Sequence, residues 1–352
     1  MDFEETQDSE TLYSPLTGND PAKAEGFSEY QKPPKKRSPW RIFWRILFVL
    51  SILANLFLLL MLLAVSTLFI TGQRGLFIEN VLREGSSLNK VAVIRLEGII
   101  DGRVSETIRK QLKTAKKDKS IKALIIRTIS PGGTVAASDR IHHEILKFRK
   151  ESAKPVVAFM QTVAASGGYY TSVACDKIIS EPTAITGSIG VMSNHLVIKQ
   201  LLEEKLGIAP VVVKSGEKKD WPSIFSETTE EQKQYLKDKL IMPAFDRFVM
   251  LVTDGRKSLS EEQVRQLSDG SVYNAAEALE KKLIDQIGYL DEAIALAEIL
   301  ADIDNAEVIE YAQPFSLSSI LISQGRSLWN IERNLLERLS IPQLFYLWDE
   351  NW

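Results

Sequence analysis

The sequence predicts an α/β domain that is held to a membrane by an N-terminal transmembrane helix. An apolar segment runs from Ile46 to Ile70, with basic residues directly before it. Beyond it, short apolar runs alternate with amphipathic stretches, a pattern typical of a mostly parallel sheet with right-handed crossovers. Glycine-, serine- and lysine-bearing loops follow three of these runs, at the strand ends where the sites of such sheets gather.

Residues 1–45 are predicted to form a disordered cytoplasmic tail, because they are polar, lack apolar periodicity and end in a basic cluster. At about 1.5 Å per residue, residues 46–70 exceed the roughly 30 Å hydrocarbon thickness of a bilayer. They are too long for a signal-peptide core and too far from Met1. Basic residues on the N-terminal side favour a single-pass protein of the plasma membrane with its later domain on the extracytoplasmic, periplasmic side. The lipid bilayer is therefore an expected partner.

We expect a connector over residues 71–90, a catalytic domain over 91–303 and a C-terminal region over 304–352. The expected strands are Val91–Leu96, Ala123–Arg127, Val156–Met160, Asp176–Ile179, Thr183–Val191, Ala209–Val213 and Glu307–Tyr311. The expected helices are Val104–Ala115, Thr134–Lys150, Asn194–Leu206, Thr228–Val252, Ser260–Leu267, Ala275–Lys282, Leu290–Leu300 and Leu328–Leu339. Ser260 and Gln263 have the spacing of a capping box. The apolar end, Ile341–Trp348, is expected to lie in a peptide groove or to brace a neighbouring subunit.

Composition excludes several function classes. With 352 residues, of which 45% are hydrophobic, the chain can bury a substantial core, and a net charge of −3 gives no basic field for nucleic acid. The single cysteine, Cys175, is expected to be a buried, inert thiol. Because the sequence has three histidines, no zinc-ligand spacing and no Walker A or dinucleotide motif, we expect neither a metal nor a cofactor.

Ser166 is the candidate nucleophile. It stands between two alanines and two glycines, Gly167 and Gly168, where the run Pro155–Met160 gives way to an expected helix. Small neighbours leave its hydroxyl accessible, and amides of a helix's first turn can point at an incoming carbonyl. The alternative interpretation is a helix N-cap serine.

A serine hydroxyl needs a base to remove its proton. His142 and His143 are adjacent in a helix and so point in different directions, and His195 begins another helix, so solvated or structural roles are expected for them. A lysine can serve if burial or nearby positive charge lowers its pKa, and the loop after Val213 offers three of them. These are Lys214, Lys218 and Lys219. Ser188 could hold an uncharged amine by hydrogen bonding. The turn Ser130-Pro131-Gly132-Gly133 allows the backbone to approach a ligand closely, so that the Gly133 and Gly167 amides could form an oxyanion hole.

Together these segments resemble the signal peptide peptidase A (SppA) family, peptidase family S49, in its short single-domain form. The resemblance covers about Val91 to Ile303. Its motifs are Ser130-Pro131-Gly132-Gly133, Ala164-Ala165-Ser166-Gly167-Gly168-Tyr169-Tyr170, Thr186-Gly187-Ser188-Ile189-Gly190-Val191 and Ser215-Gly216-Glu217-Lys218-Lys219-Asp220. It implies a crotonase-like (ClpP-like) fold, Ser166 as nucleophile and the lysine directly before Asp220, Lys219, as general base. It also implies Ser188 as the hydroxyl that orients the lysine and Gly133 as an oxyanion donor.

The sequence departs from the family pattern at two places. Ile129 stands where an asparagine often precedes the Ser-Pro-Gly-Gly turn, and Asp269–Ala275 lacks an arginine and a glycine. Neither departure touches the Ser/Lys dyad. The family further implies a homo-oligomer in which Lys219 reaches Ser166 of a neighbouring subunit.

The functional hypothesis is a membrane-anchored serine endopeptidase that degrades cleaved signal peptides and other hydrophobic or unfolded peptides. Two alternatives remain at this point: a catalytically inactive membrane scaffold of the same fold, and a crotonase-type acyl-CoA enzyme with a related oxyanion site. A membrane anchor and an external site, far from coenzyme A, argue against the second.

Overall fold

The computed structural model describes residues 39–72, 77–312 and 344–348, and it divides the chain into two units, Met1–Leu68 and Phe69–Trp352. Helix α1 (Pro39–Gly72) contains the predicted span, and its stretch Pro39–Ala64 has a mean hydropathy of 2.9 in its most apolar window with no side chain buried. This stretch is long and apolar enough to cross a membrane. Near its beginning Trp40, Phe43 and Trp44 pack on one another. Tryptophan is enriched at membrane–water interfaces.

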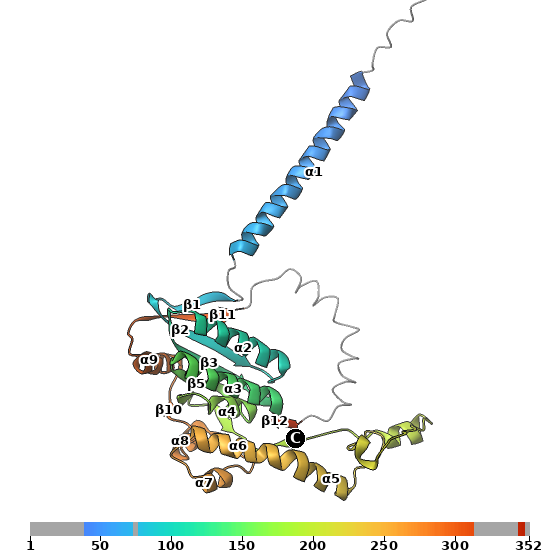
Figure 1. Cartoon of the computed structure of the whole chain (residues 1–352), viewed down its shortest axis with the longest axis vertical. Coiled ribbons are helices and arrows are strands. Elements are labelled where there is room, and N and C mark those ends of the chain that lie inside the picture. The colour runs from blue at the N-terminus through green and yellow to red at the C-terminus, as the bar shows by residue number, and fades with distance from the viewer. Residues whose placement is uncertain (1–38, 73–76, 313–343, 349–352) are drawn as a thin grey trace, which may run out of the picture. The chain divides into compact units, whose positions relative to one another are not determined.

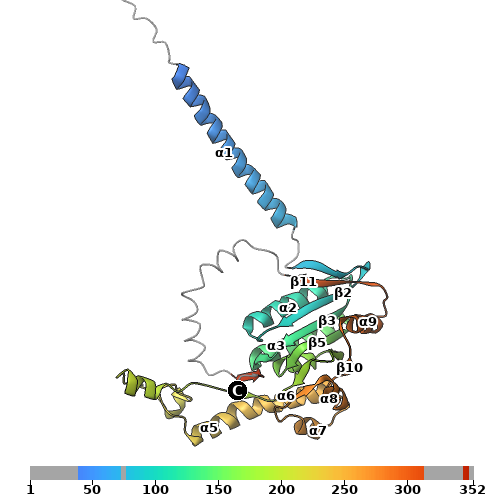
Figure 2. The same ribbon diagram turned by 180° about the vertical axis from the view of Figure 1, so that it is seen from behind.

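The second unit is built on a twisted, largely parallel sheet (Figures 1 and 2). Among the described residues this is a nine-stranded sheet in the order β1-β11-β2-β3-β5-β6-β10, with β7 and β9 joined to it through β5. The bounds are β1 Ile78–Arg83, β2 Ser86–Glu97, β3 Ile121–Ser130, β5 Val156–Ala165, β6 Lys177–Ser180, β7 Ile185–Gly187, β9 Val272–Asn274, β10 Gln286–Ile287 and β11 Ala306–Ala312. Only the β1–β11 and β7–β9 pairs are antiparallel. The predicted α/β class is confirmed.

Alternation along the central strands explains the two apolar layers of the domain. In β2, Ala92, Ile94 and Leu96 face the core that includes α2 (Gly102–Lys117) and α3 (Val135–Ser152). Val91 and Val93 face the opposite way, into a second core with α9 (Leu290–Ala301). Successive side chains of a strand point to opposite faces, so a strand covered on both sides is apolar throughout. This is why the buried strands were recognisable as continuous apolar runs.

The helices follow the predicted positions where they pack on the sheet. Asp101 caps α2 and Thr134 caps α3. The predicted capping box is present at the start of α7, where Ser260 and Gln263 exchange side-chain-to-backbone hydrogen bonds. The helical stretch 230–255 is interrupted by a π-turn, giving α5 (Glu230–Leu236) and α6 (Met242–Gly255). The remaining bounds are α4 Gly167–Ser172, α7 Glu261–Gln266 and α8 Ala275–Glu280.

Several local predictions were wrong. The expected connector contains β1, which pairs with β11, and Thr183–Val191 contributes only the short β7. The expected helix Asn194–Leu206 is reduced to a π-helical turn at Leu201–Lys205. Ala209–Val213 is not a strand, and its side chains are exposed, Val213 to 95%. Strand formation needs a neighbouring strand to pair with, and the described chain offers this segment none. The expected helix Leu328–Leu339 lies outside the described residues.

A second, three-stranded sheet lies at the carboxyl end of the main sheet. Its order is β4-β12-β8, with bounds β4 Gly132–Thr134, β8 Met192–Ser193 and β12 Leu344–Leu347. The end of the chain therefore pairs with the glycine turn that the sequence singled out. The candidate site is located at this junction.

Candidate active site

Ser166 stands at a strained corner between β5 and α4. Its backbone has φ 53° and ψ −113°, an unusual region for a residue other than glycine. The corner is held by the Ser166 N–H, which donates to Gly187 O at 2.8 Å, and by Tyr170 N–H, which donates to Ser166 O at 2.8 Å. Ser166 occupies the N-cap position of α4, but its side chain makes no capping hydrogen bond, so capping does not explain the serine side chain. Residues held in such conformations cluster at functional sites.

A change of partner along β5 brings Ser188 beside Ser166. Up to Met160 the strand pairs with β6, and from Val163 it pairs with β7, with Ala165 opposite Gly187. Ser166 and Ser188 are thus the next residues on two adjacent strands. Ser188 also has a positive φ, 49°, is 7% exposed, and donates its N–H to Ser271 O at 2.7 Å.

The Gly133 and Gly167 amides converge. A Cβ placed on Gly167 would lie 3.1 Å from the Gly133 N and 3.1 Å from the Gly132 Cα. The turn before them is fixed by Ser130, whose hydroxyl donates to Gly98 O at 2.6 Å and accepts from Gly132 N at 3.1 Å. Gly132 has φ +108°, which strongly favours glycine. The two predicted oxyanion donors are therefore neighbours in space.

A backbone carbonyl of the chain's own end lies against these glycines. Tyr346 is the register partner of Gly133 in the antiparallel β4–β12 pair, and Trp348 N donates to Pro131 O at 2.8 Å. A Cβ on Gly132 would lie 2.0 Å from Tyr346 O and 2.8 Å from Gly167 N. An extended peptide on β4 thus presents a carbonyl oxygen at the meeting point of the two loops.

The Tyr346 side chain fills an aromatic pocket. It is fully buried, its ring centroid lies 4.7 Å from that of Tyr170 and 4.8 Å from that of Phe248, and its hydroxyl donates to Ala244 O at 2.8 Å. Tyr170 in turn donates to Asp139 at 2.6 Å. Burial, followed by this bond, raises the Tyr170 pKa, so the phenol stays neutral. The pocket accepts a large apolar ring with one hydrogen-bonding group.

Hollows flank β12 on both sides. One of about 460 Å³ is lined by Ser188, Met192, Phe245 and Trp348, among others. A larger one of about 1190 Å³ runs along α2 and is lined by Ile99, Val104, Phe345 and others. The predicted Ser188 lines the smaller hollow, and Leu347 of β12 borders both.

Lys219 lies apart from this cluster. It sits in the 3₁₀ turn Glu217–Asp220, and its side chain is exposed. Both views show the segment between β8 and α5 running out beyond α5, away from the main sheet (Figures 1 and 2). The structure brings Ser166, Ser188, Gly133 and Gly167 together, but it does not bring Lys219 to them within one chain.

The other two candidate lysines, Lys214 and Lys218, have partners. Lys214 forms an ion pair with Asp220 at 2.7 Å, a bond that lowers the pKa of that carboxyl. Lys218 lies over the rings of Trp221 and Tyr235, 5.1 and 4.5 Å from their centroids. Among the described residues, neither type of interaction is found for the Lys219 amine.

The histidines and the cysteine lie in structural settings. His142 is 4% exposed and packs edge-on against Tyr170, and burial lowers its pKa to about 4. His195 Nε2 lies 2.8 Å from Thr228 Oγ1. Cys175 is buried, and that burial raises its pKa, which suppresses the reactive thiolate.

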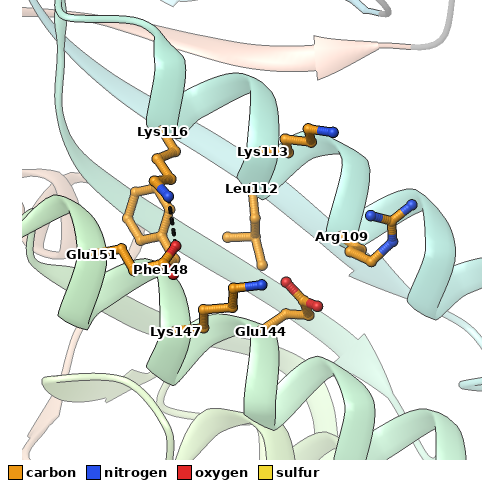
Figure 3. Close-up of a pocket in the computed structure, with 8 residues that line it drawn as sticks. All are labelled: Arg109, Leu112, Lys113, Lys116, Glu144, Lys147, Phe148 and Glu151. Atoms are coloured by element: carbon orange, nitrogen blue, oxygen red, sulfur yellow. Dashed lines mark hydrogen bonds and ion pairs between the residues drawn. The ribbon is translucent and has the colours of Figure 1, made fainter.

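A separate hollow of about 200 Å³ lies between α2 and α3 (Figure 3). The charged side chains that α2 contributes are all basic, both acidic ones come from α3, and Lys116 pairs with Glu151 at 2.5 Å across the two helices. Arg109, Lys113 and Lys147 supply most of the remaining charge. None of the residues of the candidate site lines this hollow.

The fold and the strained serine beside two glycine amides define an α/β domain with a candidate hydrolase site, and sequence comparison gives its family. The Peptidase family S49 model matches residues 148–304. A protein named "Putative signal peptide peptidase SppA" from Enterococcus faecium is 36% identical over 244 residues, which cover 66% of this chain and 70% of that protein. The chain belongs to the SppA family of S49 peptidases.

Two further comparisons add context. Protease 4 of Haemophilus influenzae is 37% identical over 221 residues, 61% of this chain but only 35% of that protein. Among solved structures, a ClpP1 mutant from Listeria monocytogenes matches with a TM-score of 0.39 and 19% identity, over 57% of this chain and 94% of that one. That score is low, and the family assignment rests on the sequence relatives.

Sequence reasoning missed two residues at the site. Ser138 lies in the first turn of α3, where a serine has no motif around it, yet its hydroxyl lies next to Gly167. Tyr346 belongs to the apolar end, which was expected to occupy a groove without any residue being singled out. Sequence spacing around Ser166 could identify neither residue, because Ser138 and Tyr346 come from elements distant from Ser166 in the chain.

Proposed function

We propose that this S49 peptidase is a membrane-anchored serine endopeptidase with Ser166 as nucleophile and Lys219 as general base. The observation that carries the proposal is the placement of Tyr346 O against Gly132, at the turn that also approaches Gly167 N next to the strained Ser166 corner. A substrate carbonyl in the position of Tyr346 O would be close to the serine and to the two glycine amides. This is the arrangement that acyl transfer requires.

In this mechanism the neutral Lys219 amine takes the proton of Ser166 as Oγ attacks the peptide carbonyl carbon. The Gly133 and Gly167 amides hold the oxyanion, and the lysine then protonates the leaving amine. Water hydrolyses the acyl-enzyme in a second, equivalent step. The Ser188 hydroxyl, next to Ser166, would form a hydrogen bond with the Lys219 amine and orient it.

Lys219 would come from a second copy of the chain. Its exposure, and the projection of its segment away from the main sheet, support pairing between subunits. The segment before it also exposes apolar side chains, including Leu196, Val211 and Val213. Contiguous exposed apolar surface marks interaction sites.

The substrates proposed are cleaved signal peptides and other hydrophobic or unfolded peptides close to the membrane. The aromatic pocket and the apolar walls beside β12 support apolar side chains in an extended backbone. The basic residues before α1 support an N-terminus in the cytoplasm and a catalytic domain on the extracytoplasmic side of the plasma membrane.

The test is labelling by a serine-reactive fluorophosphonate, together with hydrolysis of casein and a signal-peptide substrate. The wild type should label and hydrolyse, whereas Ser166→Ala and Lys219→Ala should do neither. Lys205→Ala, an exposed lysine of the same projecting segment, is the matched control and should behave as the wild type. Labelling that persists in Ser166→Ala removes the proposed nucleophile. An unlabelled, inactive wild type favours the scaffold, and acyl-CoA turnover favours the crotonase alternative.

A further inference from the structure

The Ser138 hydroxyl is a buried polar group without a hydrogen-bond partner. Ser138 is 0% exposed, and its Oγ is one of the few buried side-chain atoms in the described chain that find no partner. Leaving a buried hydroxyl unpaired is unfavourable, because the group has lost its water without replacing it. Such a group therefore requires an explanation.

Because Ser138 lies in a helix, the absence of a hydrogen-bond partner for its hydroxyl is informative. Serines inside helices commonly donate back to a carbonyl one turn earlier, as Ser172 does to Gly168 O at 2.8 Å and Ser152, also in α3, does to Phe148 O at 2.7 Å. Ser138 makes no such bond. It is not a cap either, since Thr134 caps α3 by accepting from Ala137 N.

The hydroxyl instead lies at the two glycine amides. The position that a Cβ on Gly167 would take is 2.5 Å from Ser138 Oγ and 3.1 Å from Gly133 N. Two donors that both lie within 3.1 Å of one point are close enough to reach the same oxygen at ordinary hydrogen-bond length. The free hydroxyl thus lies beside Gly167 and close to Gly133 N, the two residues whose amides are the proposed oxyanion donors.

We propose that Ser138 is a third donor of the oxyanion site, and that its hydroxyl is unpaired at rest because its acceptor forms only during the reaction. As the carbonyl carbon becomes tetrahedral, the developing oxyanion would accept from Ser138 Oγ–H as well as from the Gly133 and Gly167 amides. A donor arranged before the reaction needs no reorganisation when the charge appears. This inference rests on the proposed function.

The test compares Ser138→Ala with Ser105→Ala, a buried helical serine of α2 that is paired with Gly102 O. Ser138→Ala should lower kcat for a peptide substrate by about 10- to 100-fold with KM unchanged, somewhat less than the usual loss of an oxyanion amide. A peptide aldehyde, which forms a tetrahedral adduct with a serine, should bind more weakly by a similar factor. Binding of the uncleaved peptide, measured in a Ser166→Ala background, should not change. Ser105→Ala should retain wild-type kcat.

Thermal unfolding separates this role from a structural one. Removing an unpaired buried hydroxyl should leave the melting temperature equal or higher, whereas loss of a structural hydrogen bond would lower it. An unchanged kcat and aldehyde affinity in folded Ser138→Ala overturns the inference, even if Ser166→Ala is inactive. If Ser166→Ala itself remains active, the proposed function fails first. Should Ser138→Ala not fold, Ser138→Cys supplies the same comparison with a weaker donor, and wild-type kcat in that variant also counts against the inference.

Discussion

Replacement of Tyr346 by alanine should open the peptide groove. In the structure β12 occupies β4 through three register pairs, Phe345 opposite Thr134, Tyr346 opposite Gly133 and Leu347 opposite Gly132. Tyr346 is the only fully buried side chain described in this strand. A substrate that binds in the same register must therefore displace β12, and its apparent KM includes the cost of that displacement.

The magnitude follows from the contacts of the ring. Truncating a buried aromatic residue to alanine costs about 3–5 kcal/mol, and here two ring contacts below 5 Å and the hydrogen bond to Ala244 O are lost together. About 3 kcal/mol corresponds to roughly a 100-fold change in an equilibrium constant. KM for a peptide should fall by up to that factor, until β12 is mostly undocked, while kcat stays the same.

The assay is steady-state hydrolysis of a fluorogenic apolar peptide by the full chain. Tyr289→Ala, at an exposed tyrosine, is the control and should leave KM unchanged. Truncation after Ser340 should have the same effect as Tyr346→Ala, and sedimentation of both variants shows whether the assembly changes. An unchanged KM in both variants, with assembly intact, refutes the argument that β12 competes with substrate.

Three other predictions follow from the same structure. Mixing Ser166→Ala chains with Lys219→Ala chains should restore part of the hydrolysis, and verified mixed oligomers without recovery would contradict pairing between subunits. Gly167→Ala should lower kcat by at least about 100-fold, because its Cβ would lie 2.5 Å from Ser138 Oγ and would disturb an oxyanion amide; a variant with wild-type kcat would show that this amide is not used. Because burial lowers the His142 pKa from 6.5 to about 4, the unfolded chain binds the extra proton, and stability should fall as pH drops from 6.5 to 4, by about 3 kcal/mol in all. Urea unfolding of His142→Gln should show a flatter pH dependence over that range, and identical slopes would contradict the assignment.

The sequence predicted best what local chemistry determines. Strands covered on both faces are continuous apolar runs, and β2, β3, β5 and β11 were found at nearly their observed positions for that reason. A capping box depends on two side chains three residues apart, so Ser260–Gln263 could be recognised directly. The predictions that failed concerned elements whose structure depends on residues distant in the sequence.

The residues of the candidate site also differ in how well the sequence could predict them. Ser166, Gly133 and Gly167 were recognisable because strain and close approach demand small residues at fixed offsets, whereas Ser138 and Tyr346 reach the site only through α3 packing and the return of the chain end. Their contribution is a property of the folded chain.

The strand predicted just before Lys219 is the most informative of the wrong predictions. Residues 209–213 are apolar and end in three β-branched valines, so propensity favours a strand, yet they have no partner strand among the described residues and Val213 is 95% exposed. Burying one such side chain is worth about 1.5–3 kcal/mol, so leaving several in water is unfavourable for an isolated chain. The favourable outcome is a surface that covers this segment, and a second copy of the chain would supply it. The same contact would fix the position of Lys219 six residues further on, which a free segment cannot do, and a lysine must be held in place to act as a base. Under the proposed pairing between subunits, one contact would both cover the exposed apolar segment and bring Lys219 to Ser166.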